Sequence, residues 1–205
     1  MEFRLTYQGL LLSDGASGSR TVRKHEIRRH FHHQLKEYWG IHPFLRLLTI
    51  NDRSGRKAEK SENTLINVLA SRYTRSNGYR FLPLVRAELS VLCSLEILYL
   101  RPQQPGSLIS GPQGDIDNRL KTLFDALAAP GEGKQVPESP PQEGEDPFYC
   151  LLEDDRLVTH VSVQTDYLLM PTLQQPDIND SRIVITVRLK PFTMTMGMLG
   201  NSGFA

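Results

Sequence analysis

The segment from Leu89 to Leu100 constrains the fold of this chain more than any other. Nine of its twelve residues are apolar, and they fall on both of the faces that a strand presents. A strand with two apolar faces belongs in the interior of a sheet. Pro102 and Pro105 follow the segment and end it, because proline cannot donate a ladder hydrogen bond. We therefore expect a central strand within the strand-like stretch 79–100.

Other periodic segments supply the elements around this strand. Apolar residues that alternate with polar ones predict strands, and apolar residues three or four apart predict helices. The predicted strands cover residues 3–12, 161–169 and 183–189, and the predicted helices cover residues 22–39, 63–72 and 117–128. Strands flank helices without a strict alternation, so we expect an α+β (mixed α/β) fold with a single sheet packed by helices.

The length of 205 residues predicts one domain, which we place at residues 1–190. Residues 129–147 are rich in proline, glycine and glutamate and poor in apolar residues, which predicts a flexible insert. Residues 191–205 carry glycine, methionine and serine after their first residues, and we expect this C-terminal tail to fray.

Composition excludes several classes of protein. No apolar run approaches the roughly 20 residues of a membrane helix, so we expect no membrane association. The two cysteines, Cys93 and Cys150, do not form a disulfide framework and both lie beside apolar residues. They are typical of small core residues in a reduced compartment, which predicts a cytoplasmic protein.

Charge is unevenly distributed along the chain. Residues 1–110 hold 17 Lys and Arg against 9 Asp and Glu, whereas residues 111–205 hold 7 against 14. A basic half beside an acidic half suits a protein that grips phosphates with one surface and binds metal with another. Ordinary solvated surface with chance segregation of charge explains the same pattern.

The acidic half contains two carboxylate clusters. Asp115 and Asp117 lie two residues apart, and Lys121 follows four residues after the second. About thirty residues later the run Glu153-Asp154-Asp155 precedes a predicted strand. Divalent hard cations take oxygen ligands, and such ions can activate water and clamp a phosphate during its displacement. Together the clusters supply the parts of a magnesium-dependent phosphodiesterase.

A structural explanation of the first cluster is also open. Asp117 or Asn118 is a good N-cap for the helix that follows, and acids at that end suit the helix dipole. Lys121 would then be a solvated lysine that pairs with Asp125. The acids at 153–155 would form a turn before a strand.

The combined pattern resembles the RusA-type Holliday junction resolvases. The resemblance is carried by Asp115, Asp117, Asn118 and Lys121, then by the run Phe124-Asp125-Ala126-Leu127, and then by Asp154 and Asp155 before a strand. It covers about residues 89–169 apart from the insert. It implies a RusA-like fold and a homodimeric endodeoxyribonuclease that uses Mg²⁺, or alternatively Mn²⁺, to cut branched DNA.

The resemblance also implies roles for individual residues. Asp115, Asp117 and Asp155 would bind the metal and act in catalysis, and Lys121 would be the catalytic lysine that offsets charge on the phosphate. Asn118 and Asp154 would have supporting roles.

We expect the residues that contact DNA to differ from those of the family. Family members often carry a run of arginines before the first aspartate, and this chain has Ser110 to Gly114 there. We expect DNA contacts instead from basic residues of the first half, namely Arg23, Lys24, Arg28, Arg29, Arg53, Arg56 and Lys57. Two other functions remain open: a non-catalytic DNA-binding relative, and a metal-dependent phosphohydrolase that acts on small nucleotides.

Three histidines leave further alternatives open. His30 and His33 share one face of the first predicted helix and could bind zinc, although a solvated polar face has the same pattern. His160 could line the metal site or be a structural histidine.

Overall fold

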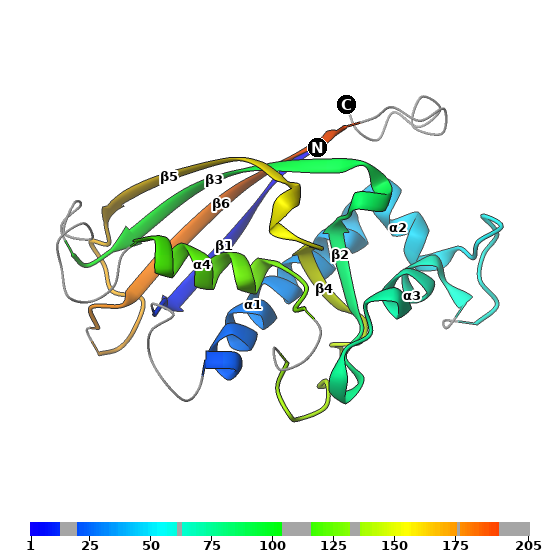
Figure 1. Cartoon of the computed structure of the whole chain (residues 1–205), viewed down its shortest axis with the longest axis horizontal. Coiled ribbons are helices and arrows are strands. Elements are labelled where there is room, and N and C mark those ends of the chain that lie inside the picture. Colours follow the sequence, from blue (N-terminus) through cyan, green and yellow to red (C-terminus); the bar gives the residue numbers. More distant parts are fainter. Residues whose placement is uncertain (13–19, 61–62, 104–115, 132–135, 176, 193–205) are drawn as a thin grey trace.

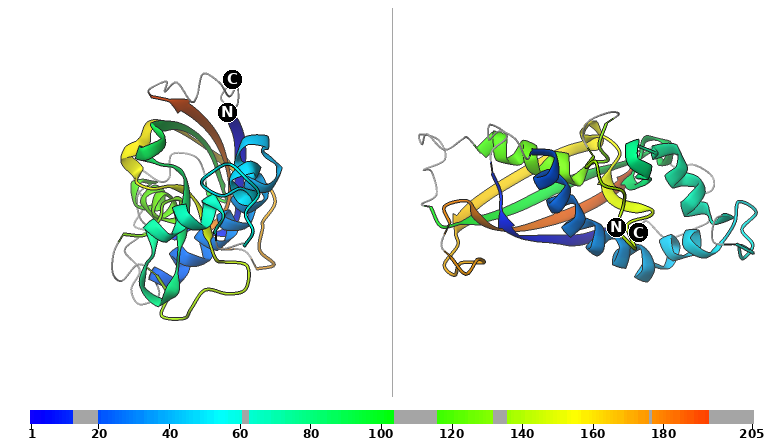
Figure 2. Two further views of the ribbon diagram at one scale, coloured as in Figure 1. Left: turned by 90° about the vertical axis from the view of Figure 1, so that its right-hand side faces the viewer. Right: turned by 90° about the horizontal axis from the view of Figure 1, so that it is seen from below.

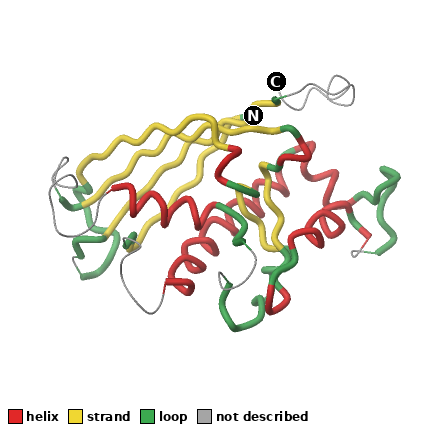
Figure 3. Tube along the Cα trace, viewed as in Figure 1, coloured by secondary structure: helices red, strands yellow, loops and turns green. Residues whose placement is uncertain are grey.

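The computed structural model describes residues 1–12, 20–60, 63–103, 116–131, 136–175 and 177–192. Asp115 and most of the predicted C-terminal tail lie outside these residues. The α+β class predicted from the sequence is confirmed, with helices and strands in mixed order (Figures 1 and 3). The principal elements are β1 (Glu2–Leu10), α1 (Arg20–Ile41), α2 (Pro43–Ile50), α3 (Leu65–Ala70), β2 (Phe81–Val85), β3 (Val91–Arg101), α4 (Ile116–Leu127), β4 (Phe148–Leu152), β5 (Val158–Tyr167) and β6 (Asp180–Pro191).

Four strands form the main sheet, in the order β1-β6-β3-β5. β6 is antiparallel to both β1 and β3, and β3 is parallel to β5. β3, the predicted central strand, is therefore interior, as the apolar residues on both of its faces require. Its residues Val91, Cys93, Leu95 and Ile97 are buried.

Helices α1 and α4 lie along one face of this sheet, as two perpendicular views show (Figure 2). The buried face of α1 carries Ile27, Phe31 and Leu35, which are 4% exposed or less, as the helical spacing predicted. α4 contributes Leu123 and Leu127 to the same core. No helix within the described ranges has both the length and the apolar character needed to cross a membrane.

The stretch 79–100 is two strands and not one. β2 ends at Val85, a short 3₁₀ turn covers Ala87–Leu89, and Ser90 adopts a left-handed conformation with φ of 49° before β3 begins. The carboxylate of Glu153 accepts a hydrogen bond from the Ala87 amide at 2.8 Å, which fixes the turn. Local apolarity continues through the turn, so periodicity alone does not reveal the break.

A second sheet departs from the single sheet that the sequence predicted. β2 and β4 pair in parallel as a two-stranded sheet, with Phe81 opposite Phe148 and Val85 opposite Leu152. Every residue of both strands is buried. Cys150 lies on β4, and burial raises the pKa of its thiol to about 12, as it does for Cys93. Both cysteines are core residues, as predicted.

The described part of the predicted flexible insert is packed against α1. Glu145 is 2% exposed, forms an ion pair with Arg29, and accepts a hydrogen bond from the Gln142 amide at 2.8 Å. Lys36 donates to the Gly144 carbonyl at 2.8 Å. Polar side chains of α1 thus contact Gly144 and Glu145 within the segment that composition predicted to be a flexible insert.

We expect Glu145→Ala to lower the free energy of unfolding by about 1–3 kcal/mol, because the buried Arg29 contact and the Gln142 amide lose their acceptor. Glu143→Ala is the matched control, since Glu143 lies two residues away and is exposed. Urea titration of both variants measures the difference. Equal midpoints would show that the ion pair does not hold this segment.

Two buried histidines of α1 predict a loss of stability in acid. His32 accepts a hydrogen bond from the Tyr149 amide at 2.9 Å, and His25 packs between Tyr79 and Phe148. Burial lowers the pKa of each ring to about 4. Below pH 6.5 the unfolded chain therefore binds protons at these rings that the folded chain does not, so stability falls as pH falls.

The expected loss is about 1.4 kcal/mol per pH unit for each ring between pH 6.5 and 5. Urea unfolding across this range measures the slope. His25→Phe keeps the aromatic packing and removes one titrating ring, so the slope should fall by about half. An unchanged slope would contradict the assignment.

Candidate active site

The end of helix α4 is bonded to the end of strand β4. Ala128 and Leu152 form an isolated parallel bridge, and the Ala129 amide donates to the Leu152 carbonyl at 2.8 Å. The helix that carries the first acidic motif therefore ends beside the second acidic cluster, which begins at Glu153. The sequence predicted that these two regions could be neighbours.

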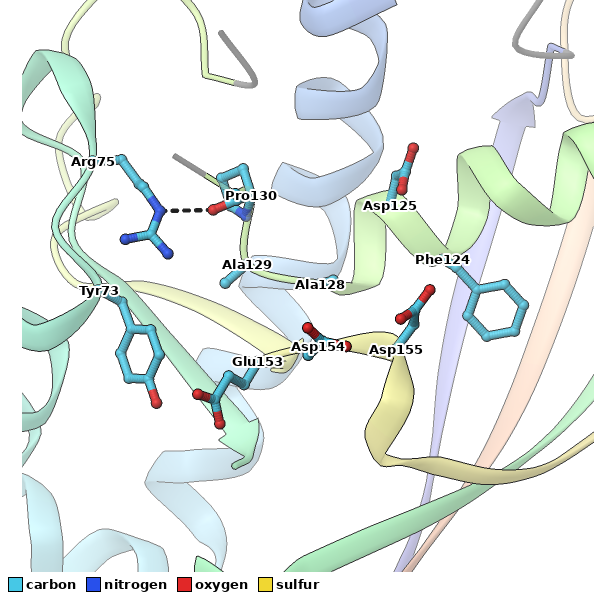
Figure 4. A pocket seen from close by; sticks show the side chains of 11 residues that line it. Tyr73, Arg75, Phe124, Asp125, Ala128, Ala129, Pro130, Glu153, Asp154 and Asp155 are labelled. Atoms are coloured by element: carbon cyan, nitrogen blue, oxygen red, sulfur yellow. Dashed lines mark hydrogen bonds between the residues drawn. The ribbon is translucent and has the colours of Figure 1, made fainter. Parts of the chain in front are cut away.

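A cavity of about 370 Å³ lies at this junction (Figure 4). Acidic side chains come to it from both sides, Asp125 from α4 and Glu153, Asp154 and Asp155 from the turn after β4. In Figure 4 the Asp155 carboxylate points toward α4 near Phe124, whereas the Asp125 side chain projects from the other side of the helix ribbon and away from Asp155. The remaining lining residues are Tyr73, Arg75, Ala128, Ala129, Pro130 and Gly131.

Basic side chains engage two of these acids. Asp154 caps the 3₁₀ turn Asp155–Leu157. Its carboxylate accepts hydrogen bonds from Nε and Nη2 of Arg156, each at 2.9 Å. These hydrogen bonds lower the pKa of the Asp154 carboxyl. Asp125 forms an ion pair with Lys24 of α1. The protein itself therefore stabilises Asp154 as an anion.

Arg75 and Tyr73 also line the cavity. Arg75 donates through Nε to the Pro130 carbonyl at 2.7 Å, which joins the segment after α3 to the end of α4. Tyr73 is 9% exposed, and its pKa is raised to about 12, first by burial and then by the charge of Glu153. Tyr73 therefore carries its phenolic proton at neutral pH and can donate it in a hydrogen bond.

The first acidic motif lies toward the other end of α4. Asp117, Asn118 and Lys121 are exposed, and the Asp117 carboxylate accepts from the Asn118 amide at 2.9 Å. Asp117 and Asp125 are eight residues apart in α4, which is about 12 Å along a helix axis. Lys121 lies between them, one turn from each, so these three side chains follow one stripe of the helix.

The predicted metal set is not gathered within the described residues. Asp155 lines the cavity and Asp117 does not, and Asp115 lies outside the residues that the structure describes. No group of three or more His, Cys, Asp or Glu that could hold a metal ion occurs in the described ranges. Asp117 and Asp155 are exposed. Exposed carboxylates are the type of ligand used by Mg²⁺, which keeps several waters and binds one or two carboxylates.

Arg28 is corrected from a predicted DNA contact to an internal residue. It is 1% exposed, and it donates to the carbonyls of Asp125 at 2.7 Å and of Ala128 at 3.3 Å. Its guanidinium lies 5.9 Å from the centre of the Phe81 ring. Helical spacing placed Arg28 on a solvated face, but α4 and β2 cover that face.

The other predicted DNA contacts divide into two groups. Lys24 and Arg29 are engaged in ion pairs with Asp125 and Glu145, and Arg23 is half-buried at the start of α1. The exposed group lies on the turn after α2, at the end of the molecule opposite the start of α4 (Figure 1), and consists of Arg53, Arg56 and Lys57.

The three histidines singled out in the sequence are exposed. His30 packs edge-on against Tyr7, which accounts for its position on α1. His160 lies on β5 opposite Ser94. None of the three belongs to a possible metal cluster in the part of the chain that the structure describes.

The sequence reasoning did not assign Asp125 to the site. The structure places it among the lining residues of the same cavity as Asp155, with Lys24 as its partner. Its eight-residue spacing from Asp117 puts both on one helical stripe, and that signal was available in the sequence. The partners Lys24 and Arg156 are set by tertiary packing and by the turn geometry, which the sequence pattern does not give.

Comparisons of the chain with models of known protein families, with curated proteins and with solved structures found no match.

Proposed function

We propose that this chain is a divalent-metal-dependent endodeoxyribonuclease of the RusA type that resolves four-way DNA junctions in the cytoplasm, acting as a homodimer. The observation that carries the proposal is the bonding of α4 to β4 through Ala128 and Leu152. It brings Phe124 and Asp125, at the end of α4, to the same cavity as Asp154 and Asp155, while Asp117 lies toward the other end of that helix.

In this proposal the exposed stripe of α4 and the mouth of the cavity receive the phosphodiester. Asp117 and Asp155, with Asp115, are the proposed ligands of Mg²⁺ or Mn²⁺. When bound, such an ion lowers the pKa of an attacking water and offsets phosphate charge. Lys121, which is exposed between Asp117 and Asp125, offers its ammonium to the phosphate oxygens.

The chain's own cations complete the arrangement. Arg156 holds the Asp154 carboxylate through two parallel hydrogen bonds and so positions the turn from which Asp155 projects. The backbone N–H of Asn118, at the first turn of α4, donates to the Asp117 carboxylate. Asp154 is thus a positioning residue for Asp155, and Asn118 is the proposed supporting residue beside Asp117.

Cleavage of an end-labelled four-way junction tests the proposal, with its matched linear duplex as the control substrate. Paired nicks on the junction that need Mg²⁺ and disappear with EDTA are the expected result. Junction binding without cleavage would favour the non-catalytic relative. Release of phosphate from nucleotides with no action on DNA would favour a small-nucleotide phosphohydrolase, for which a cavity of about 370 Å³ is large enough.

A further inference from the structure

The two edges of the four-stranded sheet are finished differently. β1 forms one edge. At this edge the side chain of Gln34 of α1 forms hydrogen bonds with the backbone of Thr6. The Thr6 amide donates to Gln34 Oε1 at 2.8 Å, and Gln34 Nε2 donates to the Thr6 carbonyl at 2.7 Å. The side-chain amide takes the place of a neighbouring strand, so the centre of this edge is closed.

β5 forms the other edge, and no described element pairs with its outer side. The strand has ten residues, of which seven are exposed. Natural edge strands are protected by lysine, proline, bulges or a covering element, because an open edge pairs with other chains. β5 contains no lysine, arginine, proline or glycine, and its one register shift lies at its start, beside Cys93 and Ser94.

Exposed apolar side chains accompany this open edge. Val161 is 43% exposed and Tyr167 is 44% exposed on the strand. Leu169 and Met170, which follow directly, are 89% and 75% exposed. A strand of high β-propensity with apolar exposure and a single acid is suited to pairing with another strand.

We infer that β5 pairs antiparallel with β5 of a second copy of this chain, which joins two four-stranded sheets into one of eight strands. A two-fold axis through Val163 places Val163 opposite itself and Val161 opposite Thr165. The same axis places His160 opposite Asp166, and these are the strand's one imidazole and its one carboxylate. The imidazole of each copy then donates to the carboxylate of the other across adjacent strands.

Neighbouring registers lack this complementarity. An axis through Ser162 places Asp166 opposite Val158, and an axis through Gln164 places it opposite Ser162. With the axis at Val163, the sequence of β5 is complementary to a second copy of itself. This complementarity favours a second copy of the chain over an unrelated strand as the partner. The inference rests on the homodimer of the proposed function and places its interface, whereas the cleavage assay tests the nuclease activity separately.

The molar mass in solution tests the interface, by light scattering at several concentrations. The wild type should have twice the mass of the chain. Ser162→Lys with Gln164→Lys places lysines opposite lysines in the proposed register, and this variant should be monomeric with an unchanged thermal midpoint. Both residues are exposed, so the substitutions leave the core intact.

Gln8→Lys with Thr186→Lys is the matched control, because it adds the same charge to the same face of the sheet at β1 and β6, away from the β5 edge. This variant should remain dimeric. A monomeric wild type would overturn the inference, and so would a dimer that the β5 lysines leave intact.

Disulfide trapping reads the register directly. With the axis at Val163, Ser162 of one copy faces Gln164 of the other, so the double variant Ser162→Cys with Gln164→Cys should cross-link under mild oxidation. Opposed residues of antiparallel strands lie about 4.5–5.5 Å apart at Cα, within the reach of a disulfide. The single variant Ser162→Cys should not cross-link. Cross-linking by that single variant would overturn the register, and its failure in the double variant would overturn the pairing.

Discussion

Asp155→Asn is expected to lower the rate of Mg²⁺-dependent junction cleavage by about 100-fold or more while leaving junction binding within about twofold of the wild type. Asp155 lines the cavity and its carboxylate points toward α4. The amide has nearly the same shape but lacks the charge that a divalent cation requires. Single-turnover cleavage and an equilibrium binding titration in EDTA separate the two effects.

Glu37→Gln supplies the control for this loss of charge. Glu37 is exposed on α1, and the substitution makes the same chemical change at a place outside the cavity. Its cleavage rate should equal that of the wild type. If Asp155→Asn cuts as fast as Glu37→Gln, Asp155 has no part in catalysis and the proposed site is wrong.

Arg28→Ala is expected to lower the free energy of unfolding by about 3–5 kcal/mol. The guanidinium is 1% exposed and bonds the carbonyls of Asp125 and Ala128 at the end of α4. Alanine leaves a cavity and removes the donors of two carbonyls near the junction of α4 with β4. Urea unfolding followed by far-ultraviolet circular dichroism measures the change.

Two comparisons distinguish this internal role from a role in DNA binding. Arg46→Ala removes an exposed arginine of α2 and should cost less than about 0.5 kcal/mol. Arg28→Met fills most of the space without the charge, and the folded variant should bind a junction as the wild type does. A stable Arg28→Ala variant with reduced DNA affinity would reverse the assignment.

The long elements were predicted well. Helix α1 was predicted at 22–39 and spans Arg20–Ile41, and the last strand was predicted at 183–189 and spans Asp180–Pro191. α2 and β4 were not predicted. α2 has only eight residues and β4 only five, and every residue of β4 is buried, so neither offers a period long enough to recognise.

The candidate site was predictable to a different degree at each residue. The neighbourhood of α4 and Asp155 followed from the motif, but the pairing of Asp125 with Lys24 joins residues 101 positions apart. Likewise, Arg28 was expected on the surface. The sequence gives the spacing of residues along α1, but it does not show which face of α1 packs against α4. Tertiary packing determines these contacts, and they cannot be predicted from the pattern of a single sequence.

The position of β6 in the sheet has a consequence for how the chain folds. β6 is the last of the described strands, yet it lies between β1 and β3 and pairs with both. Glu2 faces Arg188, so the first strand pairs with a strand that is synthesised 186 residues later. Such non-local pairing slows folding, because the loop must close before its contacts form. During synthesis β1 and the edge of β3 that does not pair with β5 therefore lack a partner and are prone to aggregation until β6 inserts between them.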